Sequence, residues 1–259
     1  MLERLAARFG PLTLVGRGAW STAFRFRRGD ADLVVRVGEH VADFRLDAEM
    51  SSYRSASLPI PVVAELEQLE PPDDHLFLCV STFAPGVALE SVEPAEWPDL
   101  VPQVADLLDA MRAATPPPSM TPDWPQTLLA PPNPDGRLVG WRSNLEARTS
   151  QFEAWEAART RLASLGALPN VAGAELTLLH GDLINRNVHV DRGRISGVFD
   201  WGCRRWGDHL YDLAWFVFWD PWMPNLDASL LVDEVVERSG AALDPERFWA
   251  CLLHIGADH

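Results

Sequence analysis

The sequence contains no lysine: all 22 of its basic residues are arginine, against 37 acidic residues. Without lysine, the chain has no Schiff-base nucleophile, no phosphate loop of the Walker type and no lysine general base. The formal net charge of −15 disfavours nucleic acid as a partner, because a phosphate backbone is bound by a basic surface. The same charge favours a cationic partner.

Cysteine is scarce, and long apolar runs are missing. Cys79, Cys203 and Cys251 lie far apart and follow no metal-binding spacing, which is typical of reduced thiols in the cytoplasm. The longest uninterrupted apolar run, residues 213–219, is far too short to span a bilayer, and the N-terminal residues have no signal-peptide core. We therefore expect a cytoplasmic protein that makes no membrane contact and is a monomer or a weak dimer.

Strand patterns dominate the N-terminal third of the chain. Short apolar or alternating runs, separated by glycine, proline and turn residues, predict strands at 12–15, 23–26, 33–37, 62–66 and 76–82. A helical pattern lies between the third and fourth runs, at 43–55, with Phe44, Met50 and Tyr53 on its expected inner face. These elements predict a small antiparallel β-rich lobe over residues 1–83.

Helical patterns fill the rest of the chain. Apolar spacing predicts helices around 101–111 and at 144–165, 208–219, 226–238 and 245–253, with Ser143 and Asp244 as N-caps. The proline-rich segment 115–140 predicts a long surface loop or a lid over a site. The fold class is therefore α+β, with a larger, mostly helical lobe over residues 84–259 and a site in the cleft between the lobes.

Polar residues follow strand-like runs within segment 178–202. Asp182 comes after one apolar run, Asn187 precedes a second, and Asp200 ends a third. We expect these three residues to lie near one another at strand ends. Two carboxylates and an amide carbonyl suit a hard divalent cation and a proton acceptor.

The motifs of this segment resemble those of the aminoglycoside phosphotransferase (APH/choline kinase-like) family, which is related to the protein kinases. The family pattern HGDxxxxN is similar to the run from His180 to Asn187, and Asp200-Trp201-Gly202 stands where kinases have Asp-Phe-Gly. The runs Leu-Pro-Ile-Pro at 58–61 and Phe-Trp-Asp-Pro-Trp at 218–222 resemble the hygromycin B phosphotransferase branch. The similarity extends over residues 12–258.

This resemblance implies a protein-kinase-like two-lobe fold and an Mg²⁺-dependent transfer of the γ-phosphoryl group of ATP or GTP to a hydroxyl. Asp182 would accept the proton of the attacking hydroxyl, and Asn187 and Asp200 would hold Mg²⁺. His180 is expected to brace the catalytic loop rather than to react. Asp212 is expected to hold backbone N–H groups of that loop.

The resemblance also implies a nucleotide site in the N-terminal lobe. Gly18 and Ser21 lie in a glycine-containing turn, where backbone and hydroxyl can approach phosphate oxygens. Arg36 stands where kinases carry a phosphate-binding lysine, with Glu49 as its expected acidic partner. The hinge whose backbone meets the purine is expected at Ser81, Thr82 and Phe83.

The acceptor site is less clearly marked. Asp208 and Asp220 are candidates for pairing with ammonium groups, and Trp222 for stacking on a sugar ring. Asp208 has a second reading, as a cap on the same helix as Asp212, while His189 is expected to be exposed. The sequence ends at His259, before the further helical sequence of the hygromycin branch, so we expect part of the acceptor wall to be missing or built differently.

The leading hypothesis is a phosphotransferase acting on a small cationic acceptor such as a hygromycin-like aminoglycoside. The first alternative is a metabolic small-molecule kinase of the choline, homoserine or sugar type, because this scaffold serves several acceptors. The second is a non-catalytic kinase-like binding module, which Arg36 and the short C-terminus motivate. The intact trio Asp182, Asn187 and Asp200 favours an enzyme.

Overall fold

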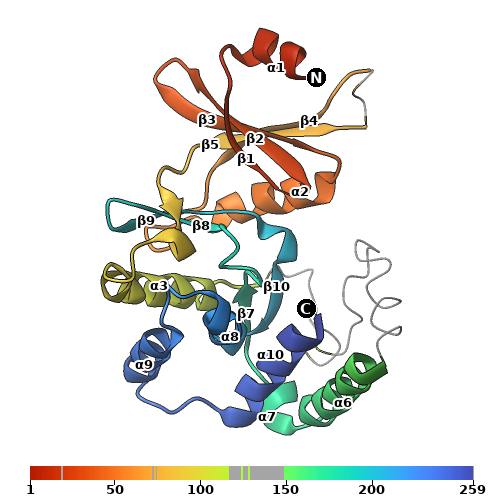
Figure 1. Cartoon of the computed structure of the whole chain (residues 1–259), viewed down its shortest axis with the longest axis vertical. Coiled ribbons are helices and arrows are strands. Elements are labelled where there is room, and N and C mark those ends of the chain that lie inside the picture. Colours follow the sequence, from red (N-terminus) through yellow and green to blue (C-terminus); the bar gives the residue numbers. More distant parts are fainter. Residues whose placement is uncertain are drawn as a thin grey trace. The chain divides into compact units, whose positions relative to one another are not determined.

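The computed structural model describes residues 1–18, 20–71, 73, 75–116, 124, 128 and 149–258. The chain forms two compact units, and each is discontinuous in sequence (Figure 1). The first unit comprises Met1–Val92 and Leu183–Arg204, and the second comprises Glu93–Asp182 and Arg205–His259.

The first unit is built on a five-stranded antiparallel sheet with the strand order β1-β2-β3-β5-β4. Its strands are β1 (Thr13–Arg17), β2 (Ser21–Arg28), β3 (Ala31–Gly38), β4 (Val63–Gln68) and β5 (Phe77–Thr82), with α2 (Val41–Met50) between β3 and β4. The predicted arrangement of strands and helix is confirmed. Helix α2 ends earlier than expected, in the 3₁₀ turn η1 (Ser51–Tyr53), so Tyr53 is only half-buried while Phe44 and Met50 are buried.

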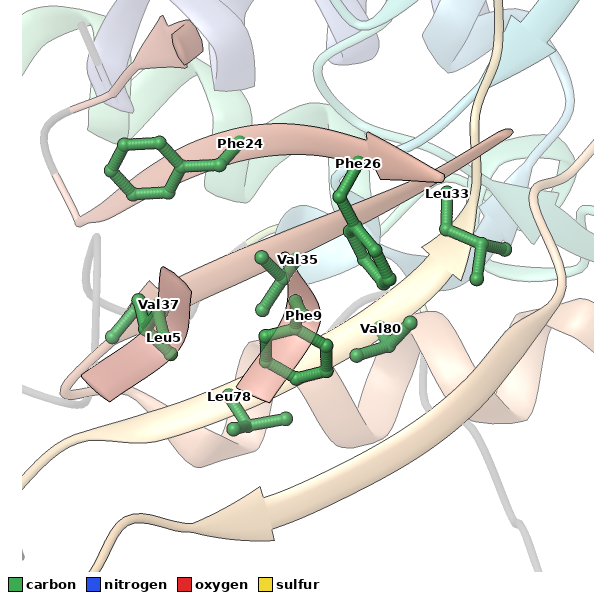
Figure 2. Packing of buried hydrophobic residues seen from close by; sticks show 9 residues of the cluster. All are labelled: Leu5, Phe9, Phe24, Phe26, Leu33, Val35, Val37, Leu78 and Val80. Carbon is green, nitrogen blue, oxygen red and sulfur yellow. The ribbon is translucent and has the colours of Figure 1, made fainter. Parts of the chain in front are cut away.

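One face of this sheet is covered by α1 (Leu2–Phe9), a helix that the sequence analysis did not anticipate. Leu5 and Phe9 lie one turn apart and pack with Val35 and Leu78 in the cluster shown in Figure 2. Each such side chain contributes about 1.5–3 kcal/mol on burial. Because side chains alternate along a strand, the residues between the core positions of β3 face the other way, which leaves Arg36 on the opposite side of the sheet.

A second, three-stranded sheet of the first unit has the order β6-β8-β9 and joins β6 (Val87–Ala88) to the hairpin β8 (Val188–Asp191) and β9 (Arg194–Val198). The 3₁₀ turns η2 (Leu89–Ser91) and η3 (Trp201–Cys203) accompany it. Gly86 adopts φ 108°, and a Cβ there would collide with the Val190 carbonyl. The hairpin therefore packs closely against the segment of β6 and Gly86, which belongs to the N-terminal part of the chain. A functional division at residue 83 stays a prediction, since the compact units do not follow it.

The second unit is mostly helical, as predicted. Its elements are α3 (Trp97–Arg112), α6 (Thr149–Gly166), α7 (Pro169–Ala172), α8 (Leu210–Trp219), η4 (Asp220–Trp222), α9 (Ala228–Ser239), α10 (Pro245–Asp258) and the short strands β7 (Leu176–Leu179) and β10 (Arg205–Asp208). Asp244 caps α10 as expected, because its Oδ1 accepts hydrogen bonds from the N–H groups of Glu246 and Arg247 at 3.0 and 3.1 Å. Helix α8 begins later than predicted because Asp208 ends β10.

Most of segment 115–140, and the expected cap Ser143, lie outside the described residues. Trp124 and Leu128 are described, and both are helical and fully buried. At these two positions the expectation of a surface loop is wrong, because both apolar side chains are buried, and Trp124 packs beside Tyr211 and Gly207. Among the described helices, none is long and apolar enough to cross a membrane.

Candidate nucleotide-binding and catalytic site

The first unit contains a cavity of about 450 Å³ on the face of the sheet opposite α1. Its walls come from the turn after β1, the inner strands β2 and β3, the end of β5, and both flanks of the β8–β9 hairpin. Of the residues predicted to bind nucleotide or metal, those that line this cavity are Gly18, Ser21, Arg36, Ser81, Phe83, Asn187 and Asp200.

The hairpin sets the two expected metal ligands opposite each other. Asn187 directly precedes β8, and Asp200 follows β9, while the Phe199 N–H donates to the Asn187 carbonyl at 3.0 Å. Asp200 adopts the left-handed conformation, with φ 65°, a strain that clusters at functional sites. Mg²⁺ is commonly bound by one or two protein oxygens together with substrate phosphates. An amide and a carboxylate in one cavity therefore fit this ion.

Arg36 points to the same cavity from β3, and its guanidinium forms a buried ion pair with Asp47 of α2. Burial is the largest single effect on the pKa of Arg36 and lowers it, but the charge and hydrogen bond of Asp47, together with Cys79 and Asp200, outweigh burial, so the pKa lies above its ordinary value. The other Asp47 oxygen accepts the Trp201 N–H at 2.9 Å. Asp47 thus joins the cation on β3 to the backbone directly after Asp200.

The expected pairing of Arg36 with Glu49 is wrong. Glu49 is exposed, does not line the cavity, and pairs instead with Arg204 at 2.6 Å. Residues two positions apart on a helix differ by about 200° in direction, so Asp47 and Glu49 face in nearly opposite directions. The sequence held a signal for Asp47, because it shares three-residue spacing with the buried Phe44 and Met50.

His189 was expected to be exposed, and this is also wrong. It is half-buried in the cavity wall, where its Nδ1 lies 3.2 Å from the Ala84 carbonyl and its ring meets Phe199 edge-on at 4.7 Å. Burial lowers the pKa of His189. The alternation argument failed because the side of β8 that carries His189 is not open to solvent there, since Ala84 and Phe199 lie against the ring.

The catalytic loop belongs to the second unit up to Asp182. Asp212, fully buried on α8, accepts the N–H groups of His180 and Gly181, both at 2.8 Å. The His180 ring accepts the Asp182 N–H through Nδ1 at 3.2 Å. These contacts hold the loop backbone on both sides of the turn at Gly181, which has φ 78°. They are the contacts that the supporting roles of His180 and Asp212 require.

Asp212 should make stability depend on pH. Burial raises its pKa from 3.8 to about 6, against the lowering effect of its two backbone hydrogen bonds. The native state therefore binds the proton more tightly than the unfolded chain, and the stability that this group contributes increases as the pH falls from 7 to 5. In chemical denaturation, we expect wild type to gain about 1 kcal/mol over Asp212→Asn across that range. A difference that is constant with pH would contradict this assignment.

The acceptor candidates have different surroundings. Asp208 is fully buried, forms a bidentate pair with Arg247 at 2.7 Å for both contacts, and accepts the Leu210 N–H at 3.0 Å. Its proposed contact with a cationic ligand is therefore wrong, because a protein cation already neutralises it. The capping reading is correct for the start of α8, although Asp208 itself lies on β10.

Asp220 and Trp222 lie in η4 at the end of α8. Asp220 is half-buried and its Oδ1 accepts the Ala228 N–H at 2.9 Å. Trp222 is 62% exposed, and its ring lies beside Trp219 and Phe218 with centroids 5.6 and 6.2 Å away. Trp222 therefore offers an aromatic face to solvent, whereas tryptophans such as Trp215 belong to the core.

Three features together are typical of kinase-like phosphotransferases. They are an antiparallel sheet with a buried Arg–Asp ion pair, an amide and a carboxylate on a hairpin, and an HGD loop whose backbone N–H groups are held by side chains. The chain belongs to the phosphotransferase enzyme family, whose profile matches residues 11–249. It is 28% identical to Hygromycin-B 4-O-kinase of Escherichia coli over 95% of this chain and 73% of that protein.

Solved structures agree with this assignment. A thermostable mutant of the aminoglycoside phosphotransferase APH(4)-Ia, in a ternary complex with AMP-PNP and hygromycin B, superposes with a TM-score of 0.80 at 27% identity, covering 99% of this chain and 88% of that one. A type VIII aminoglycoside-3'-phosphotransferase superposes with a TM-score of 0.65 at 20% identity, covering 98% and 97%, and supports the fold alone. The predicted protein-kinase-like fold and phosphotransferase class are confirmed.

Proposed function

We propose that this protein transfers the γ-phosphoryl group of ATP to a hydroxyl of an aminoglycoside in an Mg²⁺-dependent reaction. The observation that carries the proposal is the cavity of the first unit, which joins Arg36, Asn187 and Asp200 in one site. Phosphoryl transfer requires positioning and charge neutralisation more than covalent chemistry. The glycine-containing turn and the Arg36–Asp47 pair provide positioning, and the two oxygen ligands provide a place for the metal ion that neutralises charge.

The hinge backbone supports ATP as the co-substrate. The Thr82 N–H donates to the Val62 carbonyl at 3.0 Å, and the Phe83 N–H donates to the Asp32 carbonyl at 3.1 Å. The next backbone donor along the chain that lines the cavity is Ala84, since Pro85 has no N–H. A single N–H donor suits the N1 acceptor of adenine, whereas guanine presents a donor at that position.

Each reacting group has a named partner in this proposal. Asn187 and Asp200 hold Mg²⁺, which neutralises charge on the triphosphate when bound. Asp182 orients the acceptor hydroxyl and takes its proton. Arg36 stabilises the nucleotide site through Asp47, and Gly18 and Ser21 border the phosphate end of the cavity.

The class of acceptor is proposed from the net charge of the protein and from its sequence similarity to a known kinase. An aminoglycoside carries several ammonium groups, and the formal net charge of −15 favours such a ligand. The exposed ring of Trp222, with Asp220 beside it in η4, is the proposed sugar-contacting surface. Similarity to a hygromycin kinase over 95% of the chain supports this class of acceptor.

The test is a radiolabelled phosphate-transfer assay with ATP or GTP and Mg²⁺ against a panel of acceptors. The panel should contain hygromycin B, kanamycin, choline, homoserine and methylthioribose. We expect ATP-dependent labelling of an aminoglycoside only. Labelling of choline or homoserine in its place would identify a metabolic kinase, and labelling of no acceptor despite nucleotide binding would identify a binding module.

Replacing Asp200 should uncouple nucleotide binding from the metal. We expect Asp200→Ala to abolish the increase in ATP affinity that Mg²⁺ causes, because one of the two oxygen ligands is lost. Isothermal titration with ATP, with and without Mg²⁺, measures the effect. Asp191→Ala on the same hairpin is the matched control, since Asp191 does not line the cavity. Mg²⁺-dependent binding that survives in Asp200→Ala would exclude this metal assignment.

A cytoplasmic location is part of the proposal, because ATP and Mg²⁺ are available there. Cys79, Cys203 and Cys251, which are all described, form no disulfide, which agrees with a reducing compartment. The expectation of a monomer or weak dimer stays a prediction, as does the absence of nucleic-acid and membrane partners.

A further inference from the structure

Three arginines line the cavity, and they differ in how their charge is balanced. Arg36 is neutralised by its ion pair with Asp47. For Arg17 and Arg186, no acidic side chain in the described part of the chain lies within 4.0 Å of the guanidinium. In a chain without lysine, these are the cations of the cavity that remain available to an anionic ligand.

Of these two arginines, Arg186 has the more unusual backbone conformation. It adopts φ 68°, in the left-handed region that arginine rarely enters because its Cβ crowds the backbone there. Such strain persists only where the surroundings impose it. Arg17, in contrast, ends the fully exposed edge strand β1.

The backbone of Arg186 is held by Glu90 in η2. Its Oε1 accepts the Arg186 N–H at 2.6 Å, and burial raises the pKa of this carboxylate. The carboxylate contacts the backbone of Arg186, and the positive charge of Arg186 partly offsets the effect of burial on the pKa of Glu90. Arg186 itself is exposed and lines the cavity. Glu90 thereby holds the residue directly before the proposed metal ligand Asn187.

We infer that Arg186 contacts the triphosphate of the nucleotide and that Glu90 is the residue that positions it. This inference rests on the proposed function, because it concerns the same cavity. The triphosphate carries more negative charge than one Mg²⁺ neutralises, and the charge of Arg36 is already balanced by Asp47. A planar guanidinium can donate two parallel hydrogen bonds to phosphate oxygens. Arg186 adds a positive charge beside the proposed metal ligands that is separate from the Arg36–Asp47 pair.

The experiment compares ATP with adenosine, both titrated in the presence of Mg²⁺. We expect Arg186→Ala to weaken ATP binding about 10- to 100-fold, the range for a lost charge-assisted hydrogen bond, and to leave adenosine affinity within about two-fold. Arg186→Lys should recover part of the ATP affinity because it keeps the charge. Arg192→Ala is the matched control, since Arg192 is also exposed, also has a positive φ of 51°, and lies outside the cavity.

Glu90 provides an independent arm. Glu90→Ala removes the acceptor of the Arg186 N–H and should weaken ATP but not adenosine, whereas Glu90→Gln keeps a side-chain oxygen and should bind ATP like wild type. Unchanged ATP affinity in Arg186→Ala, or an equal loss for ATP and adenosine, would overturn the inference while leaving the proposed function intact. A wild-type protein that binds no ATP would overturn both.

Discussion

Asp182→Asn is expected to lower kcat for phosphate transfer by about 10²–10⁴-fold, the range for loss of a positioned proton acceptor. Asparagine keeps the size of the side chain but cannot accept the proton of the attacking hydroxyl. Affinity for ATP should change little, because Asp182 is not among the residues that line the nucleotide cavity. Initial-rate kinetics with the acceptor that wild type labels, together with ATP titration, measure both quantities.

The fold of this variant should be preserved. The loop is held through backbone N–H groups, including the Asp182 N–H that donates to His180 Nδ1 at 3.2 Å, and asparagine retains that donor. Asp191→Asn makes the same chemical change on the exposed part of the hairpin and should keep wild-type turnover. If Asp182→Asn turns over like wild type, another group takes the proton and the assignment of Asp182 is incorrect.

Asp47→Ala is expected to destabilise the protein by about 3–5 kcal/mol, the range for removing one partner of a buried ion pair. The Arg36 charge would remain in a mostly buried position without its carboxylate, and the Trp201 N–H would lose its acceptor. Mg²⁺-dependent ATP binding should weaken as well, because Trp201 directly follows Asp200. Urea denaturation and ATP titration of the same preparations measure the two effects.

Glu49→Ala is the matched control for this experiment. Glu49 lies on the same helix, and its carboxylate is exposed, but the side chain of its partner Arg204 is only 10% exposed. Glu49→Ala therefore also leaves a buried guanidinium without its carboxylate and is expected to lower stability, but it should leave Mg²⁺-dependent ATP binding near wild type, because neither Glu49 nor Arg204 lines the cavity. If Glu49→Ala proves the more damaging of the two to ATP binding, the pairing of Arg36 with Asp47 does not describe the protein in solution.

Local sequence was sufficient for the five-stranded sheet and α2 of the first unit and for most of its cavity, although not for α1. Alternating apolar residues predicted the strands, and the glycine-containing turn placed Gly18 after β1 and Ser21 at the start of β2. The hairpin of β8 and β9 brought Asn187 and Asp200 into one cavity because its two strands are adjacent in sequence and pair directly. Short-range pairing of this kind leaves few alternatives.

Residues whose partners are distant in sequence could not be predicted in this way. Asp208 was predicted to bind a cationic ligand, but it pairs with Arg247. His189 was predicted to be exposed, but Ala84 and Phe199 lie beside it. Charge and polarity alone do not say which counter-ion a carboxylate meets. Only packing between elements that are far apart in the chain decides it.

The sequence by itself determined that this phosphotransferase works without lysine and that Arg36 is the basic residue on the third strand. Only the tertiary structure decided which carboxylate neutralises the charge of Arg36. The phase of α2 turns Asp47 toward Arg36 and Glu49 away from it, so the charge at the lysine position is neutralised within the protein. The phase of the helix is fixed by burial of Phe44 and Met50, which the sequence predicted; that Asp47 on the same face meets Arg36 depends on how α2 packs against β3.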